Sequence, residues 1–144
     1  MPSGPDLLVA CHHPAIAWNV DDLTARLSAV LPALLALPGK EAPVLLEELG
    51  EVEISLVDDS TIARVHMDFM GVPGATDVIT FQHGEIVISL DTAARVADEL
   101  GRTIAEEVLL YCIHGLLHLQ GYDDTTADAR AAMSARQEEL LALF

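Results

Sequence analysis

Hydrophobic and polar residues alternate along several short segments of the chain, as they do in β-strands with one buried face. The clearest case is residues 51–57, EVEISLV, where apolar residues occupy every second position from Val52 onward. Shorter apolar segments predict three further strands, at residues 7–12, 77–81 and 85–90. Only residues 82–84 separate the last two, so we expect a hairpin there.

Apolar positions at helical spacing, together with residues that cap helix ends, predict five helices. We expect them at residues 21–36, 58–69, 91–101, 103–120 and 126–143. Asp21 or Asp22 is the expected N-cap of the first helix, and Asp91 that of the third. Thr103 and Glu106 have the T-x-x-E spacing of a capping box, which would begin the fourth.

The predicted helix at residues 103–120 is apolar almost all round, which is typical of a helix buried at the centre of a domain. Four strands and five helices predict an α+β fold, with a small mixed sheet packed with helices around that central buried helix. The chain has 144 residues, 51% of them hydrophobic, which suits a single domain over residues 1–144. The Pro/Gly-rich segment 37–43 is expected to be a loop within it.

One segment, HGLLHLQGYDD, carries the spacing of a metal site. His114 and His118 are four residues apart, so a helix places both imidazoles on one face, as in helical zinc sites. Gly121 permits a turn that ends the helix and brings the chain back. That turn can bring Asp124 close to the two imidazoles, so that all three side chains could bind one ion. We therefore expect His114, His118 and Asp124 to be metal ligands.

Other interpretations of these residues remain open. The two histidines could satisfy hydrogen bonds in the core, and Asp124 could be the N-cap of the last helix. A metalloprotease is disfavoured, because Gly115 occupies the position where such enzymes carry their catalytic glutamate. Two histidines and one carboxylate are also the ligands of iron oxygenases, but those sites usually lie on β-strands.

The charge balance of the chain is strongly acidic. It has 23 Asp and Glu against 7 Lys and Arg, for a net charge of −16. Composition alone therefore argues against a nucleic-acid binder, since phosphates are normally met by clusters of basic residues. The excess could instead reflect solubility in a salty cytoplasm, or a basic protein partner.

No apolar run is long enough to span a membrane, and the N-terminal segment lacks the basic region of a signal peptide. We therefore expect a cytoplasmic protein that does not contact the membrane. Cys11 and Cys112 lie in apolar surroundings, and we expect two buried free thiols rather than a disulfide.

Several motifs, in order, resemble the bacterial endoribonuclease and rRNA-maturation family called YbeY. The resemblance covers about residues 51–141 and rests on ISLVDDSTIARVHMDFMG, ATDVITF, EIVISLDTAAR and HGLLHLQGYDD. It implies a zincin-like metal-dependent hydrolase with one zinc ion. It also implies cleavage of single-stranded RNA in rRNA maturation and ribosome quality control, with rRNA and the small ribosomal subunit or its proteins as partners.

The chain departs from the family pattern at two positions. The family's third metal ligand is a histidine where this chain has Asp124, and a family arginine is replaced by Met70. That arginine is expected to contact phosphate, which Met70 cannot do, although Arg64 lies six residues earlier and could partly substitute. An alternative function is therefore a metal-bound ribosome assembly factor that is weakly active or inactive and acts through protein contacts.

Five further residues are candidates for the reaction. Asp123 could orient or deprotonate the attacking water, or could simply be a turn residue whose side chain bonds the local backbone. Thr76 and Asp77 precede a predicted strand and are expected to line the substrate cleft, where Met70 would also lie. His83, in the predicted hairpin, is the last candidate for contact with substrate.

Overall fold

The computed structural model describes residues 4–38 and 45–144. The elements of this part of the chain follow one another as β1 (Asp6–Cys11), α1 (Val20–Leu35), the 3-10 turn η1 (Leu46–Glu48), β2 (Glu51–Val57), α2 (Asp59–Met70), β3 (Val78–Phe81), β4 (Glu85–Ser89), α3 (Leu90–Leu100), α4 (Ile104–Leu119) and α5 (Ala127–Leu141). All four predicted strands and all five predicted helices are present, with ends shifted by a few residues at most. The predicted break at residues 37–43 lies largely outside the described residues.

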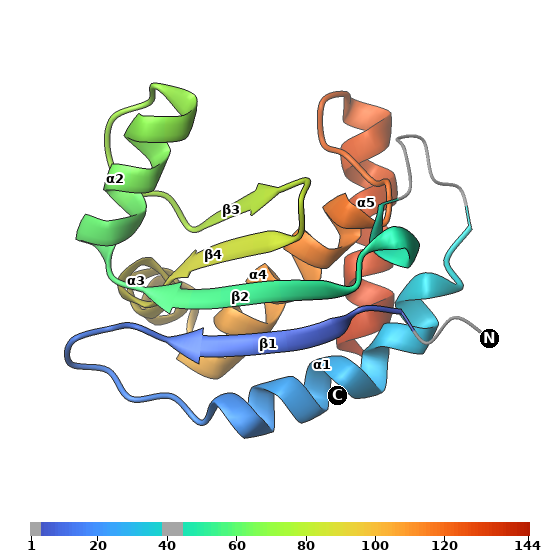
Figure 1. Ribbon diagram of the computed structural model, residues 1–144, viewed down its shortest axis with the longest axis horizontal. Helices are drawn as coiled ribbons and strands as arrows, with labels where there is room; N and C mark the ends of the chain where they lie inside the picture. The colour runs from blue at the N-terminus through green and yellow to red at the C-terminus, as the bar shows by residue number, and fades with distance from the viewer. Residues whose placement is uncertain (1–3, 39–44) are drawn as a thin grey trace.

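The four strands form one mixed sheet in the order β1-β2-β4-β3 (Figure 1). β1, β2 and β4 are parallel neighbours, whereas β3 pairs antiparallel with β4 through the predicted hairpin. β3 is therefore an edge strand of the sheet.

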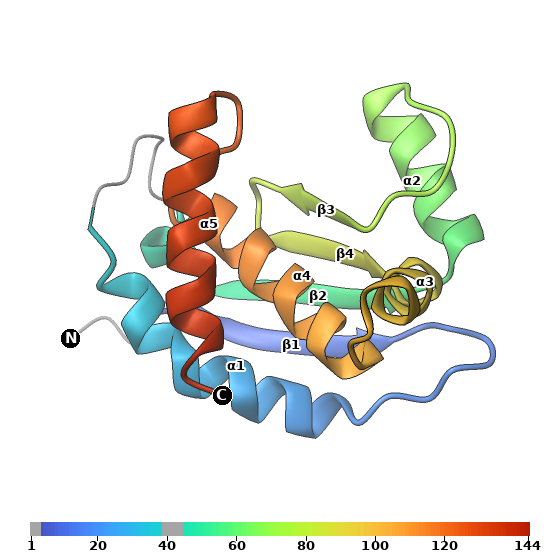
Figure 2. The ribbon, with the colours of Figure 1, turned by 180° about the vertical axis from the view of Figure 1, so that it is seen from behind.

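Helices α3, α4 and α5 cover one face of the sheet, with α4 crossing it and α1 lying alongside β1 (Figure 2). Period-two alternation sends the apolar side chains of β2 and β4 into this layer. The largest fully buried side chains that the sheet and α4 contribute to the core are those of Ile54, Leu56, Ile86, Ile88, Ile113, Leu116 and Leu117. On the opposite face, α2 packs through a smaller cluster formed by Val57, Ile62, Ile79 and Val87.

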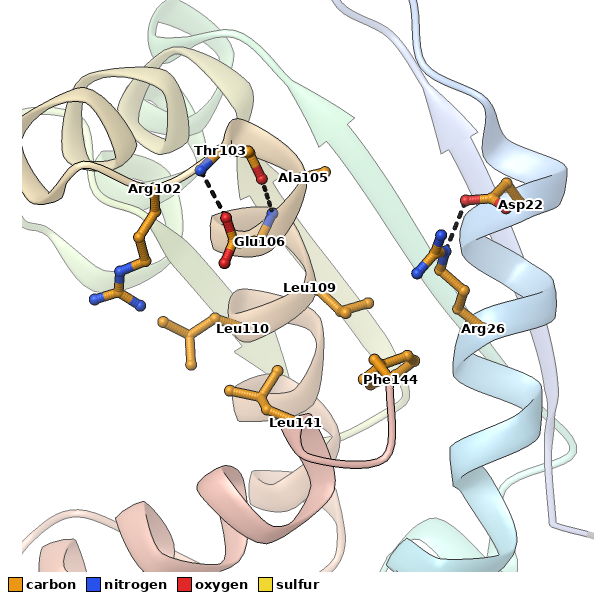
Figure 3. Close-up of a pocket in the computed structure, with 10 residues that line it drawn as sticks. All are labelled: Asp22, Arg26, Arg102, Thr103, Ala105, Glu106, Leu109, Leu110, Leu141 and Phe144. Carbon is orange, nitrogen blue, oxygen red and sulfur yellow. Dashed lines mark hydrogen bonds and ion pairs between the residues drawn. The ribbon is translucent and has the colours of Figure 1, made fainter.

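The predicted capping box begins α4. The Thr103 hydroxyl accepts a hydrogen bond from the Glu106 amide at 3.1 Å, and the Glu106 carboxylate accepts one from the Thr103 amide at 2.9 Å (Figure 3). Two backbone donors that the helix itself cannot satisfy are thus satisfied by side chains.

Two predicted N-caps are wrong. Asn19, not Asp21 or Asp22, caps α1 by accepting a hydrogen bond from the Asp22 amide at 3.0 Å. Ser89, not Asp91, caps α3, because that helix follows the last residue of β4 without a loop.

Asp91 has a different function, since it joins three segments of the chain. One carboxylate oxygen lies 2.8 Å from Nε2 of His13, and the other accepts a hydrogen bond from the Asp59 amide at 2.9 Å. Nδ1 of His13 accepts hydrogen bonds from two backbone amides, so its Nε2 carries the proton donated to Asp91. Asp91 thereby ties the loop after β1 to the start of α2.

Both cysteines are free, as predicted. Cys112 is buried, and burial raises the pKa of its thiol to about 12, so it is an unreactive core residue; Cys11 is only partly buried. Within residues 4–38 and 45–144, no helix combines the length and the hydrophobicity that crossing a membrane would require.

Candidate metal centre

The three predicted ligands lie together at the C-terminal end of α4. His114 and His118 are one helical turn apart, and Gly121, at φ 103°, takes the positive-φ backbone predicted for it. The chain then turns back and places Asp124 beside the two imidazoles. One potential ligand atom from each residue lies within 4.8 Å of the other two. No other such group of three occurs among the described residues.

Hydrogen bonds orient both imidazoles. Nδ1 of His114 lies 3.2 Å from Oε1 of Gln137 on α5, and Nδ1 of His118 lies 3.1 Å from the carbonyl oxygen of Tyr122. Both partners are oxygen acceptors, so each Nδ1 carries a proton and each Nε2 keeps its lone pair. Contacts of this kind fix the tautomer of metal-binding histidines.

The spacing of the two Nε2 atoms fits a shared ion. They lie 3.2 Å apart, whereas two nitrogens about 2.0–2.1 Å from one tetrahedral ion are separated by about 3.3 Å. Without a cation, two lone pairs face each other across this distance. Two nitrogens and one carboxylate also form a donor set that divalent transition metals accept. The residues therefore fit a metal.

The surroundings of His118 favour the neutral imidazole, which is the form that binds a metal. Burial is the largest cause that lowers its pKa, and neighbouring His114 lowers it further. Asp124, the Tyr122 carbonyl and Asp123 act in the opposite direction, but the net shift is downward. The imidazole of His118 is therefore neutral at neutral pH and can donate its lone pair.

The alternative interpretation of Asp124 as a helix cap is wrong. Thr126 caps α5, its hydroxyl accepting a hydrogen bond from the Ala129 amide at 3.0 Å. Asp123 makes the contacts of a turn residue, since its carboxylate accepts hydrogen bonds from the amide and hydroxyl of Thr125 at 3.2 and 2.9 Å. Asp124 makes no comparable cap contact, which leaves its carboxylate free to bind an ion.

A cavity of about 420 Å³ opens over the three ligands, between the end of α2, β3 and the end of α4. It gathers four of the residues predicted to contact substrate or water, namely Met70, Thr76, Asp77 and Asp123. His83 and Arg64 are not among the residues that line it. Arg64 therefore does not supply the cation that Met70 lacks.

Three residues of this centre were not predicted from the sequence. Gln137 lies 23 positions beyond His114, and its contact depends on how α5 packs, so no local pattern identifies it. Tyr122 acts through its backbone carbonyl, which any residue carries. His66 lines the cavity with its Nδ1 held 3.0 Å from the Gly74 carbonyl, and its position four residues before Met70 was the available signal.

Close packing between α4 and the sheet disfavours a glutamate at position 115, beside the first histidine. A Cβ atom at this position would lie 2.8 Å from Cδ1 of Ile86 and 3.0 Å from Oγ1 of Thr80. The first distance is shorter than real Cβ contacts and the second is tighter than most of them, so any side chain here would force its neighbours to shift.

A second cavity, of about 470 Å³, lies between α1 and the start of α4 (Figure 3). Arg26 and Arg102 are among the residues that line it, and Arg26 is paired with Asp22 at 2.9 Å. Leucines and Phe144 form much of its wall. It holds no group of metal-binding side chains among the described residues, so the candidate chemistry is at the first cavity.

Comparison with known proteins agrees with this geometry. A family model described as "Endoribonuclease YbeY" matches residues 17–144. Endoribonuclease YbeY of Moorella thermoacetica is 36% identical over 141 residues, which cover 85% of this chain and 86% of the relative. The chloroplastic endoribonuclease YBEY of Arabidopsis thaliana is 36% identical over 113 residues, which cover 67% of this chain but 19% of the plant protein.

A solved structure has the same fold. The solution structure of TM1509 from Thermotoga maritima superposes with a TM-score of 0.59 at 23% identity, covering 94% of this chain and 86% of that one. The family match also begins well before residue 51, where the motifs recognised in the sequence start, and so includes α1. This mixed α/β chain belongs to the endoribonuclease YbeY family.

Proposed function

We propose that the chain is a metal-dependent endoribonuclease that cleaves single-stranded RNA during rRNA maturation and ribosome quality control. The observation that carries this proposal is the group formed by His114, His118 and Asp124 in the floor of an open cavity. The relatives, named endoribonucleases at about 36% identity, support the reaction class. The acidic composition, which argued against a nucleic-acid binder, is thus a poor guide to the substrate.

We infer that one zinc ion binds His114 Nε2, His118 Nε2 and the Asp124 carboxylate. Such an ion lowers the pKa of a water molecule at its open position and polarises the phosphoryl oxygen. Around it, Gln137 and the Tyr122 carbonyl hold the two imidazoles in place.

The other residues of the cavity have separate proposed roles. Asp123 lines the cavity next to Asp124, and the carboxylate oxygen that Thr125 does not occupy is proposed to orient the attacking water or to accept its proton. Thr76 and Asp77 line the wall just before β3, where the Thr76 hydroxyl can donate a hydrogen bond to phosphate and the Asp77 carboxylate can accept one from a ribose hydroxyl. Met70 also lines the cavity and offers only apolar contact.

The alternative of an inactive assembly factor is not favoured, because the relatives are named as enzymes and the cavity keeps its donor set. An oxygenase is disfavoured because the relatives are named endoribonucleases and the two histidines lie on a helix. We further propose that residues 1–144 form one domain and that the protein acts in the cytoplasm. Its proposed partner, besides RNA, is the small ribosomal subunit or its proteins. In that domain α4 is the central helix, an arrangement supported by its packing against β3, β4, α1, α3 and α5.

Replacing Asp124 tests the ligand assignment and the function together. Asp124→Ala should lose most of its affinity for zinc and its cleavage of single-stranded RNA, while Asp124→His should retain zinc. Asp128→Ala, which removes a carboxylate from the first turn of α5, is the matched control and should behave as the unchanged protein.

Zinc content by elemental analysis and RNA cleavage with and without a chelator are the measurements. Unchanged zinc stoichiometry and affinity in Asp124→Ala would refute the ligand assignment. RNA cleavage that a chelator leaves unaffected would refute the metal-dependent mechanism.

A further inference from the structure

Three aromatic rings contact one another at the edge strand β3, on the face of the sheet that α2 covers. Phe69, in the last turn of α2, meets Phe81, at the end of β3, edge to face at 5.3 Å between ring centroids and 75° between planes. Phe81 in turn stacks on His83, in the β3–β4 turn, at 5.5 Å and 24°. We call Phe69, Phe81 and His83 the aromatic ladder.

The two ends of the ladder are exposed to solvent. Phe69 is 71% exposed and the side chain of His83 is 70% exposed, whereas Phe81 packs against the small cluster under α2. The central ring is therefore anchored in the fold and supports two outer rings. Exposure of a phenylalanine to this extent leaves a large apolar surface in water.

None of the three rings lines the cavity over the proposed metal ligands, but each is next in sequence to a residue that does. Met70 follows Phe69, and Gln82 separates Phe81 from His83. A polynucleotide whose phosphate reaches the proposed metal ligands and whose chain continues over the edge of β3 would bring its neighbouring nucleotides to these rings.

The charge of the cavity makes another source of affinity necessary. Among the described residues that line it there is no lysine or arginine, and the whole chain carries a net charge of −16. Phosphate contacts, which dominate most nucleic-acid binding, are thus scarce here. Stacking of bases on aromatic rings requires no cation and tolerates any base.

We propose that the aromatic ladder is a stacking platform for unpaired nucleobases that flank the scissile phosphodiester. The proposal rests on the endoribonuclease function proposed above and adds that this chain binds its substrate through unpaired nucleobases. Double-stranded RNA, whose bases are already stacked on one another, cannot use such a platform. The ladder thus accounts for a preference for single strands.

A protein partner is the competing occupant, because Met67, Met70 and Val72 add exposed apolar surface beside Phe69. The stacked geometry of Phe81 and His83, and their place next in sequence to cavity-lining residues, favour a nucleobase. A flat ring matches another flat ring, whereas protein interfaces generally need a wider apolar surface.

The test uses the full chain with zinc, and short single-stranded oligouridylates as substrate. Phe69→Leu removes the ring but keeps an apolar side chain, and Phe69→Trp keeps a ring. We expect Phe69→Leu to raise KM between about fivefold and a hundredfold with little change in kcat, because stacking contributes equally to substrate and transition state. Phe69→Trp should keep KM within about twofold of the unchanged protein.

Two comparisons isolate the base. Phe144→Leu, at a phenylalanine that is 41% exposed in the other cavity, is the control and should leave KM unchanged. An oligouridylate with abasic sites flanking the cleavage position should raise KM for the unchanged protein. The same abasic substrate should give little further rise for Phe69→Leu, since the contact is already lost.

The ladder and the proposed function fail in different ways. Equal KM values for Phe69→Leu and the unchanged protein, on intact and abasic RNA, would overturn the ladder while the ribonuclease stands, and would leave the surface to a protein partner. If the unchanged protein cleaves no RNA, the proposed function fails. In that case equilibrium binding of labelled oligouridylate decides the ladder, and equal Kd values for the two proteins overturn it.

Discussion

Replacing Gly115 by alanine is expected to destabilise the protein, although alanine is the better helix former. The added Cβ would lie 2.8 Å from Cδ1 and 3.0 Å from Cγ2 of Ile86, and 3.0 Å from Oγ1 of Thr80. Alanine gains about 1 kcal/mol over glycine in a helix interior, whereas overpacking a filled core costs about 1–3 kcal/mol. Ile86 is fully buried and cannot swing away freely, so we expect a net loss of about 1 kcal/mol.

A double-mutant cycle in urea, on the metal-free protein, measures whether the clash is the cause. Ile86→Val removes Cδ1, the atom nearest to the new methyl group, and by itself should cost about 0.5–1.5 kcal/mol. If the clash dominates, Gly115→Ala should cost at least about 0.5 kcal/mol less in the Ile86→Val background than in the parent. Gly50→Ala is the matched control, since a Cβ there meets nothing within 4 Å.

Two results would refute this reasoning. One is a Gly115→Ala protein that is as stable as the parent or more stable, which would mean that the sheet yields to the methyl group without cost. The other is strict additivity with Ile86→Val, which would place the strain elsewhere, for example at Thr80.

Four further outcomes follow from the structure. Thr103→Ala should lower the free energy of unfolding by about 1 kcal/mol in a denaturant melt, through loss of the α4 capping box, and no change would contradict that role. Gln137→Leu should weaken zinc binding about 10–100-fold in a competition titration, because His114 loses its orienting acceptor; undiminished affinity would argue against the contact. Met70→Arg should raise the rate of RNA cleavage, since arginine can bind phosphate with two hydrogen bonds, and a folded variant without gain would refute this. In the metal-free protein, burial lowers the pKa of His118, so below about pH 6.5, the ordinary pKa of histidine, the unfolded chain takes up a proton before the folded one. Stability should therefore fall with pH in that range, and it should fall less steeply in His118→Gln.

Most of the fold could be predicted because its signals are local. The alternation in β2 and the T-x-x-E spacing at Thr103 depend on neighbours a few residues apart. The two wrong N-caps show the limit of such signals. Asp91 has the right residue type for a cap, but His13 and the Asp59 amide, 78 and 32 positions away, compete for its carboxylate.

In the site, too, residues fixed by local spacing could be predicted, whereas residues fixed by packing could not. His114, His118 and Asp124 could be predicted because a helix and a glycine turn fix their relative positions within eleven residues. Gln137 and the aromatic ladder could not, because they depend on the packing of α5 and on the pairing of β3 with β4. The net charge argued wrongly against a nucleic-acid substrate, because it is a sum over the whole chain and does not describe any one cavity.

The hydrogen bond between Gln137 and His114 has a consequence for the order in which the centre is completed during synthesis. The three proposed metal ligands all lie before α5 in the chain, so they emerge from the ribosome ahead of Gln137. Until α5 has docked on α4, the ring of His114 lacks this acceptor. If the three residues bind a metal as proposed, metal capture and docking of α5 are linked equilibria, in which each strengthens the other by the same free energy.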